Sequence, residues 1–209
     1  MKGKVQTVLG PVDAGDLGIT LTHEHLLVIA SGGFRVPEDP DLRGKSLEPV
    51  SYENVGWVRY HPLLNRDNLE LTDESVAIEE AMRFRDAGGR TIADLSTLSS
   101  GRNPAALARI ARATGLNIVM GTGYYTEATV SKQVKNGLSE DVLTDVMVRD
   151  ITDGVGDTGI KAGVIGELGT DWPMTAFERM QLRAAVRAQK QTGAPMNIHS
   201  GKSPSAPFE

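Results

Sequence analysis

Residues 113–123 read ATGLNIVMGTG: the end of a helical segment, a Thr-Gly pair and then a short apolar strand. The same arrangement recurs at 157–169 (DTGIKAGVIGELG) and 191–200 (QTGAPMNIHS), and a Gly-Gly version stands at 86–96 (DAGGRTIADLS). Glycine ends a helix because it tolerates the left-handed conformation that follows the last turn. The strands that come next are almost continuously apolar, which is typical of strands covered on both faces.

Helix start signals separate these strands. Polar N-cap residues precede the helical patterns at Thr72, Asn103 (before Pro104), Ser139 and Thr175, which has capping-box spacing to Glu178. We therefore predict strands near 18–23, 91–96, 117–122, 162–168 and 195–199 that alternate with helices. This alternation predicts an α/β fold with a parallel sheet, either open and doubly wound or closed as a (β/α)₈ barrel. No GxGxxG or P-loop motif follows the first strand, which disfavours dinucleotide and nucleotide binding.

Composition narrows the class of protein. A length of 209 residues suits one domain or a large part of one, and a net charge of -5 gives no electrostatic basis for binding nucleic acid or an anionic membrane. The absence of cysteine excludes disulfides and thiolate metal sites. No stretch approaches the ~20 apolar residues of a membrane span, and the start of the chain has no signal-peptide core, so we expect a cytoplasmic protein. Residues 30–70 lack a clear period and predict a long loop after the first strand.

Two of the four histidines lie in TLTHEHLL (20–27), at the end of the first predicted strand. The zinc-protease motif HExxH is excluded because its second histidine would stand where Leu27 does. Side chains alternate along a strand, so His23 and His25 should point to one face and Glu24 to the other. Two converging imidazoles are a natural start to a metal site. The alternative is a polar strand end with two hydrogen-bonded histidines.

Two later strands also end in a side chain that can bind metal. Glu167 ends GVIGELG and His199 ends MNIH. Taken alone, Glu167 fits an ion pair, since an unpaired buried charge is costly, and His199 fits a hydrogen-bonded core histidine. Together with His23 and His25, they place four ligand-type side chains at the carboxyl ends of three parallel strands, where α/β proteins build their sites. The joint pattern predicts a metal site.

The chain resembles the phosphotriesterase family of the amidohydrolase superfamily along essentially its whole length. The segment GKVQTVLGPVDAGDLGITLTHEHL (3–26) is similar to the family's N-terminal signature. The segments IKAGVIGELG (160–169) and MNIHSGKSPSAPFE (196–209) most resemble the phosphotriesterase-related protein branch. The resemblance implies a (β/α)₈ TIM-like barrel, of which residues 1–209 would form about the first five βα units, as the N-terminal part of a single metal-dependent hydrolase domain.

The resemblance also implies two divalent metal ions, usually zinc, at the carboxyl-terminal mouth of the barrel. It assigns His23 and His25 to the more buried ion, His199 to the second ion, and Glu167 to the catalytic carboxylate that bridges both. Phosphotriesterases proper carry a carboxylated lysine at the bridge. Glu167 thus follows the related branch and disfavours paraoxon-type activity. The remaining family ligands, a sixth-strand histidine and an eighth-strand aspartate, would lie beyond residue 209.

Four further residues are candidates for a substrate pocket. Tyr124 and Tyr125 follow the third predicted strand, and in lactonase relatives an aromatic residue here lies against the substrate. Trp172 follows the fourth strand as a candidate pocket wall, and Lys202 is a candidate to face an anionic end of the substrate. Each has a plainer interpretation: packing at a loop base for the tyrosines, a loop anchor for the tryptophan and a solvated position for the lysine.

The sequence therefore predicts a hydrolase in which a bridging hydroxide attacks a small ester, lactone or N-acyl amide. The related branch implies an N-acyl amide such as N-acetylated taurine. Two alternatives stay open. One is a binding protein that keeps the metal site without turnover, in line with the resiniferatoxin-binding label of this branch, and the other is a phosphotriesterase or lactonase proper. The expected partner is a small molecule, and a homodimer is compatible with the sequence.

Overall fold

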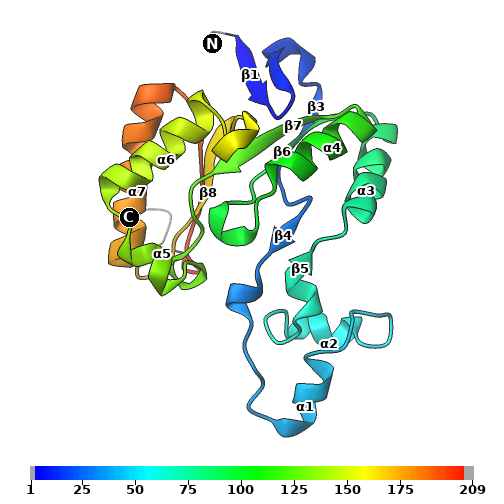
Figure 1. The fold of residues 1–209 in the computed structure, drawn as a ribbon. Helices are drawn as coiled ribbons and strands as arrows, with labels where there is room; N and C mark the ends of the chain where they lie inside the picture. Colours follow the sequence, from blue (N-terminus) through cyan, green and yellow to red (C-terminus); the bar gives the residue numbers. More distant parts are fainter. Residues whose placement is uncertain (1–2, 205–209) are drawn as a thin grey trace.

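The centre of the structure, a computed structural model that describes residues 3–204, is a curved parallel sheet in the order β3-β6-β7-β8-β9 (Figure 1). Its strands are β3 (Ile19–Glu24), β6 (Gly89–Asp94), β7 (Asn117–Thr122), β8 (Val164–Gly169) and β9 (Met196–His199). Each strand pairs in parallel with the next sheet strand along the chain. Such sequential winding is how a (β/α)₈ barrel is built, and every strand predicted from the sequence is confirmed.

Helices connect the strands and cover the outer face of the sheet (Figure 1). They are α3 (Glu74–Asp86), α4 (Pro104–Thr114), α6 (Glu140–Thr152) and α7 (Ala176–Thr192), with the short α5 (Lys132–Asn136) ahead of α6. The predicted caps at Asn103, Ser139 and Thr175 all form. The N-cap predicted at Thr72 is wrong by one residue. Asp73 caps α3 instead, because its carboxylate accepts from two backbone N–H groups of the first turn. No helix in residues 3–204 is long and apolar enough to span a membrane.

The core lies between the helices and the sheet. Ile110, Ile118, Leu143, Met147 and Ile165 are all fully buried. Burying such a side chain contributes about 1.5–3 kcal/mol, so this layer holds the strands in place. The strand ends are then free to carry polar groups.

A β-hairpin that the sequence did not predict lies at the amino ends of the strands, at the top of Figure 1. Its strands are β1 (Lys4–Thr7) and β2 (Gly10–Asp13). The backbone N–H of Val8 donates to the carbonyl of Ile118 at 2.8 Å. Val5 packs against an interior cluster of Leu95, Val119 and Val164. The hairpin therefore covers the end of the sheet opposite the predicted site.

The connection at 30–70 projects away from the sheet at the other end (Figure 1). It contains α1 (Pro40–Lys45) and α2 (Val55–Tyr60), and the strands at its two ends, β4 (Val28–Ile29) and β5 (Glu70–Leu71), pair with each other at its base. The two short helices were not predicted, because α2 buries only Val58 and α1 buries no side chain, so neither leaves an apolar period. Residues 205–209 of the MNIHSGKSPSAPFE segment lie outside the described residues.

Candidate metal centre

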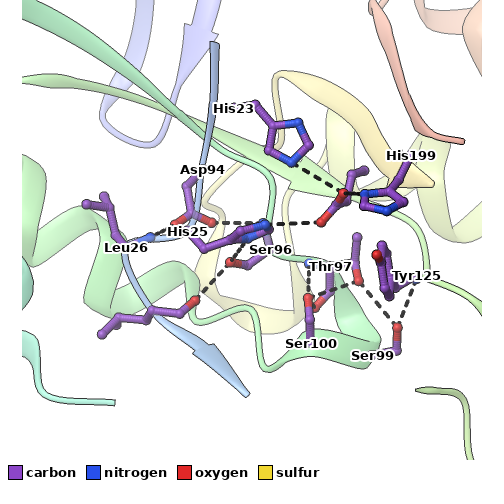
Figure 2. Close-up of polar contacts among 12 residues, drawn as sticks. His23, His25, Leu26, Asp94, Ser96, Thr97, Ser99, Ser100, Tyr125 and His199 are labelled. Carbon is purple, nitrogen blue, oxygen red and sulfur yellow. Dashed lines mark hydrogen bonds and ion pairs between the residues drawn. The ribbon is translucent and has the colours of Figure 1, made fainter. Parts of the chain in front are cut away.

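Three imidazole rings surround the carboxylate of Glu167 (Figure 2). Nε2 of His25 lies 3.1 Å from Oε1, whereas Nε2 of His23 and Nδ1 of His199 lie 3.3 and 3.0 Å from Oε2. Glu167 itself is only 6% exposed. Ligand atoms of His23, His25 and Glu167 all fall within 4.8 Å of one another, which is close enough to share one ion. The four predicted metal ligands are thus brought together.

Two glycines allow the strands to meet around Glu167. Gly166 has a φ of +129°, and a Cβ added to it would strike the carbonyl oxygen of Asn197 on β9. A Cβ on Gly121 of β7 would strike the carbonyl oxygen of Gly166 in the same way. Only glycine permits both approaches. The close packing of β7, β8 and β9 at this level therefore depends on glycine, and it holds the Glu167 backbone in place.

His23 and His25 reach the carboxylate from the end of β3. Their ring centroids are 5.5 Å apart, and both rings face Glu167. Glu24, between them, is exposed and lines a groove beside α3 that His25 also lines. The two rings contact the same carboxylate as expected, although the pairing of β3 with β6 is irregular between Leu21 and Glu24.

The other nitrogen of His25 is held by Ser96, just after β6 (Figure 2). The Ser96 hydroxyl donates its proton to the carbonyl of Leu27 at 2.8 Å. It must then accept from Nδ1–H of His25, which lies 3.1 Å away. The lone pair of a neutral His25 therefore sits on Nε2 and faces the Glu167 carboxylate. A lone pair opposite an anion requires a cation, either a proton or a metal ion, and this donor set fits a metal.

A buried carboxylate supports the turn that carries His25. Asp94, at the end of β6, is 0% exposed and accepts from the backbone N–H of Leu26 at 2.7 Å and of Ser96 at 3.1 Å. Burial raises the pKa of Asp94, against these two hydrogen bonds and the charge of His25. Asp94 and Ser96 were not predicted from the sequence as part of the site. Their only signal is that two polar residues interrupt the apolar pattern at the end of a strand.

The charges at the centre favour an ionised carboxylate. Burial raises the pKa of Glu167, but the hydrogen bond from His25 and the charges of the three histidines outweigh it, so the pKa lies below its usual value. Burial lowers the pKa of His25, but the hydrogen bond and charge of Glu167 outweigh that effect and raise it. The centre is therefore an anion among imidazoles, which is a suitable environment for a divalent cation.

Tyr125 lies beside the centre and Tyr124 does not. The Tyr125 ring lies 5.0 Å from that of His199, edge to face, and its backbone N–H donates to the Ser99 hydroxyl at 2.9 Å. Burial, together with the charges of Glu167 and Asp171, raises the pKa of Tyr125 to about 12, so the phenol keeps its proton. Tyr124 is 8% exposed and packs against Phe177 in the core, which matches its packing interpretation.

Of Lys202 and Trp172, only Lys202 lines a cavity beside the centre. Lys202 lines a cavity of about 380 Å³ together with His199 and Tyr125. Trp172 is not part of the lining, and its backbone lies against Gly201 instead. Of the four pocket candidates, Tyr125 and Lys202 thus line the cavity beside the centre, and Lys202 is exposed.

The helix α7 holds two of the loops around the centre. Glu178, predicted as a capping-box residue, is 0% exposed and accepts from the backbone N–H groups of Glu127, Asp171 and Thr175 at 3.1, 3.0 and 2.9 Å. Gln181, one turn on, accepts from the N–H of Tyr124 at 3.0 Å. The loops after β7 and β8 are therefore tied to one helix.

Residues 3–209 match the phosphotriesterase family, and the chain belongs to this family. It is 41% identical over 210 aligned residues to the N-acetyltaurine hydrolase of Rattus norvegicus, a match that covers 100% of this chain and 60% of that protein. It is 43% identical to the phosphotriesterase-related protein of Nematostella vectensis, over 99% of this chain and 60% of the relative. The chain thus spans about 60% of the length of these relatives.

Solved structures agree with the barrel fold. A resiniferatoxin-binding protein from Rhodobacter sphaeroides superposes with a TM-score of 0.91 at 36% identity, covering 94% of this chain and 55% of that one. A mutant of a phosphotriesterase-like lactonase from Deinococcus radiodurans superposes with a TM-score of 0.72 at 30% identity, covering 98% and 57%. The predicted family, branch and fold class are confirmed.

Proposed function

We propose that this chain carries the metal-binding part of a hydrolase that cleaves small N-acyl amides. The observation that supports it most directly is the convergence of His23, His25 and His199 on the Glu167 carboxylate. Three imidazole nitrogens and one carboxylate are a donor set suited to zinc, and the chain has no cysteine to offer instead. The centre is at the carboxyl ends of parallel strands, where barrel enzymes act.

In this proposal two divalent ions bind per chain. His23 and His25 would hold the first ion, His199 would hold the second, and the Glu167 carboxylate would supply negative charge to both. Divalent ions in such a pair lower the pKa of a bound water and polarise a carbonyl group. Glu167 contributes the negative charge that offsets the repulsion between the two cations. Because its pKa lies below the usual value, it supplies that charge throughout the neutral range.

Tyr125 has a separate role. Its phenol keeps its proton because its pKa is raised to about 12, so it is a hydrogen-bond donor and not a base. It lines the same cavity as His199. We assign it to orienting the acyl oxygen of a substrate, a role that a phenylalanine could not fill.

The N-acyl amide is favoured over an ester or lactone by the relatives. The rat, mouse and human relatives named N-acetyltaurine hydrolase align over the whole of this chain. The experiment is to load the full-length protein with zinc, count the bound ions by elemental analysis and assay N-acetyltaurine beside an acyl-homoserine lactone. Two ions and amide cleavage are expected. One ion or none after reconstitution would contradict the binuclear centre. Cleavage of the lactone but not of the amide would show that the protein is a lactonase.

A second candidate function is ligand binding without turnover. The structural similarity to the resiniferatoxin-binding protein, with a TM-score of 0.91, favours it. The discriminating result is tight binding of resiniferatoxin by a zinc-loaded protein that cleaves neither amide nor lactone.

A further inference from the structure

The cavity beside the candidate metal centre has two cationic side chains in its wall. Its volume is about 380 Å³, within the range of small-molecule sites. His199 and Tyr125 form the wall next to the centre, and Arg35 and Lys202 form part of the remainder. Arg35 comes from the 30–70 connection, whereas Lys202 follows β9. Segments far apart in the sequence thus bring two positive charges to one cavity.

These two charges have no ion-pair partner in the part of the chain that the structure describes. Neither Arg35 nor Lys202 forms an ion pair within residues 3–204. Some exposed arginines elsewhere are paired, such as Arg109 with Glu74 and Arg187 with Asp141, whereas others lie singly on the surface, so what distinguishes Arg35 is that it shares one cavity with a second cation. A pair of unmatched cations in a concave wall favours an anion, since charges interact more strongly where water is partly excluded.

One carboxylate also lines the cavity. Asp171 is held there through its backbone N–H, which donates to buried Glu178 at 3.0 Å. With Arg35 and Lys202 at +2 and Asp171 at -1, the charged residues of the lining sum to +1. The candidate metal centre at one wall adds further positive charge once loaded. The charged residues of the lining therefore favour an anion.

We propose that Arg35 and Lys202 bind the anionic end of the substrate, a sulfonate or carboxylate, while its acyl group faces the metal centre. This inference rests on the proposed function and adds to it two specificity-determining residues, which would recognise the charged end of an N-acyl amide. A guanidinium matches the oxygens of either anion in a two-pronged contact, and the lysine adds a point charge. The 30–70 connection thus becomes a specificity element.

The test uses the full-length, zinc-loaded protein and three substrates of similar size. N-acetyltaurine ends in a sulfonate, N-acetyl-β-alanine in a carboxylate and N-acetylpropylamine in a methyl group. The variants are Arg35→Gln and Lys202→Gln. Lys132→Gln is the matched control, because Lys132 is an exposed lysine outside this cavity and also lacks an ion pair within the described residues. All three substitutions remove one positive charge.

We expect the wild-type protein to prefer both anions, and each cavity variant to raise KM for them by about 10- to 100-fold, since a charge-assisted hydrogen bond contributes about 1.5–3 kcal/mol. The value of kcat should change little, because the contact is made equally in the ground and transition states. N-acetylpropylamine and the Lys132→Gln protein should show no such change. Arg35→Lys should retain more sulfonate binding than Arg35→Gln.

A binding measurement separates this inference from the proposed function. Calorimetry with ethanesulfonate, which cannot be hydrolysed, should show binding that weakens with salt and is lost in Arg35→Gln. Equal KM values for anionic and neutral amides, or variants that weaken both alike, would overturn the inference while leaving the hydrolase intact. If none of the amides is cleaved, the proposed function fails, and the ethanesulfonate result still decides whether the cavity binds anions.

Discussion

The Ser96 hydroxyl lies 3.1 Å from Nδ1 of His25 and determines which nitrogen of that ring carries the proton. Its own proton is used by the carbonyl of Leu27 at 2.8 Å, so it can only accept from the imidazole. Metal-binding histidines in proteins are held in this way by partners behind the ring, and those partners affect affinity. Ser96 therefore acts as a positioning residue for the candidate metal centre.

Replacing Ser96 by alanine should weaken zinc binding about 10- to 100-fold, the usual effect of removing such a partner. The physical reason is that the His25 ring would be free to rotate or to change tautomer. Competition titration with a zinc chelator measures the affinity, and ¹⁵N shifts of the imidazole report the tautomer. Ser96→Thr, which keeps the hydroxyl, is the control. Unchanged zinc affinity and ¹⁵N shifts in the alanine variant would reduce Ser96 to a packing residue.

Substitution of Glu167 by alanine should abolish hydrolysis and remove at least one of the two zinc ions, because the bridging anion is lost. Glu167→Lys should regain part of the activity when bicarbonate is supplied, since a carboxylated lysine restores an anion at similar reach. Elemental analysis and turnover with and without bicarbonate measure both effects. Near-normal turnover of the alanine variant would show that Glu167 is only the partner of an ion pair.

The sequence was most informative where a pattern is local. Strand positions, three of the helix caps and the shared face of His23 and His25 follow from spacing along the chain, and the structure confirms each. Glu167 and His199 could be added because parallel strands present their carboxyl ends at one edge.

The features of the site that the sequence did not predict depend on contacts between segments that are distant in the chain. Arg35 lines the cavity beside His199 because the start of the 30–70 connection, at Gly32, lies next to Thr129 in the loop after β7, and no periodicity in the sequence predicts this contact. Gln181 reads as an ordinary helix residue, yet it binds the loop that carries Tyr125. The two adjacent tyrosines were equivalent in the sequence. They differ in the structure because Tyr124 packs against Phe177 and Tyr125 against His199.

An ion-pair cluster between α6 and α7 should make stability depend on pH. Glu140 accepts from Arg183 at 2.8 Å and Arg187 at 3.4 Å, and these arginines hold the pKa of Glu140 below its ordinary value of 4.5. A lowered pKa in the folded state means that the contribution is complete above 4.5 and disappears as the pH falls through the folded-state pKa.

The Glu140→Gln protein should therefore melt below wild type at pH 7, and the difference should vanish in acid. Thermal unfolding of the full-length protein between pH 7 and pH 3 measures it. Glu79→Gln is the control, since Glu79 is exposed and forms no ion pair within residues 3–204. A melting difference that stays constant over the whole range from pH 7 to pH 3 would assign the effect to helix capping by the side chain and not to its charge. Added salt should shrink the difference at pH 7.

Glu178 should be essential for holding the loops after β7 and β8. Its buried carboxylate accepts from three backbone N–H groups, those of Glu127, Asp171 and Thr175. Glu178→Ala would leave all three without this partner, and each buried unpaired group costs about 1–3 kcal/mol. We expect a loss of several kcal/mol in the free energy of unfolding, measured by urea titration, whereas Arg179→Ala, which changes an exposed neighbour on the same helix, should be near neutral.

The kinetics of hydrolysis give a second test of the hydrogen bonds that Glu178 accepts from the two loops. Because Asp171 lines the cavity and Glu127 lies two residues after Tyr125, release of these loops should raise KM and lower kcat at temperatures where the Glu178→Ala protein is still folded. Zinc content should stay at the wild-type level, since none of the four proposed ligands contacts Glu178. The stability and activity of Glu178→Gln should lie between those of wild type and Glu178→Ala. Its amide oxygen can still accept from one backbone N–H, whereas its NH₂ group would face N–H donors that it cannot accept from. If Glu178→Ala unfolds at the same urea concentration as wild type, the three N–H groups must have found other partners, and the loops are held by Gln181 instead.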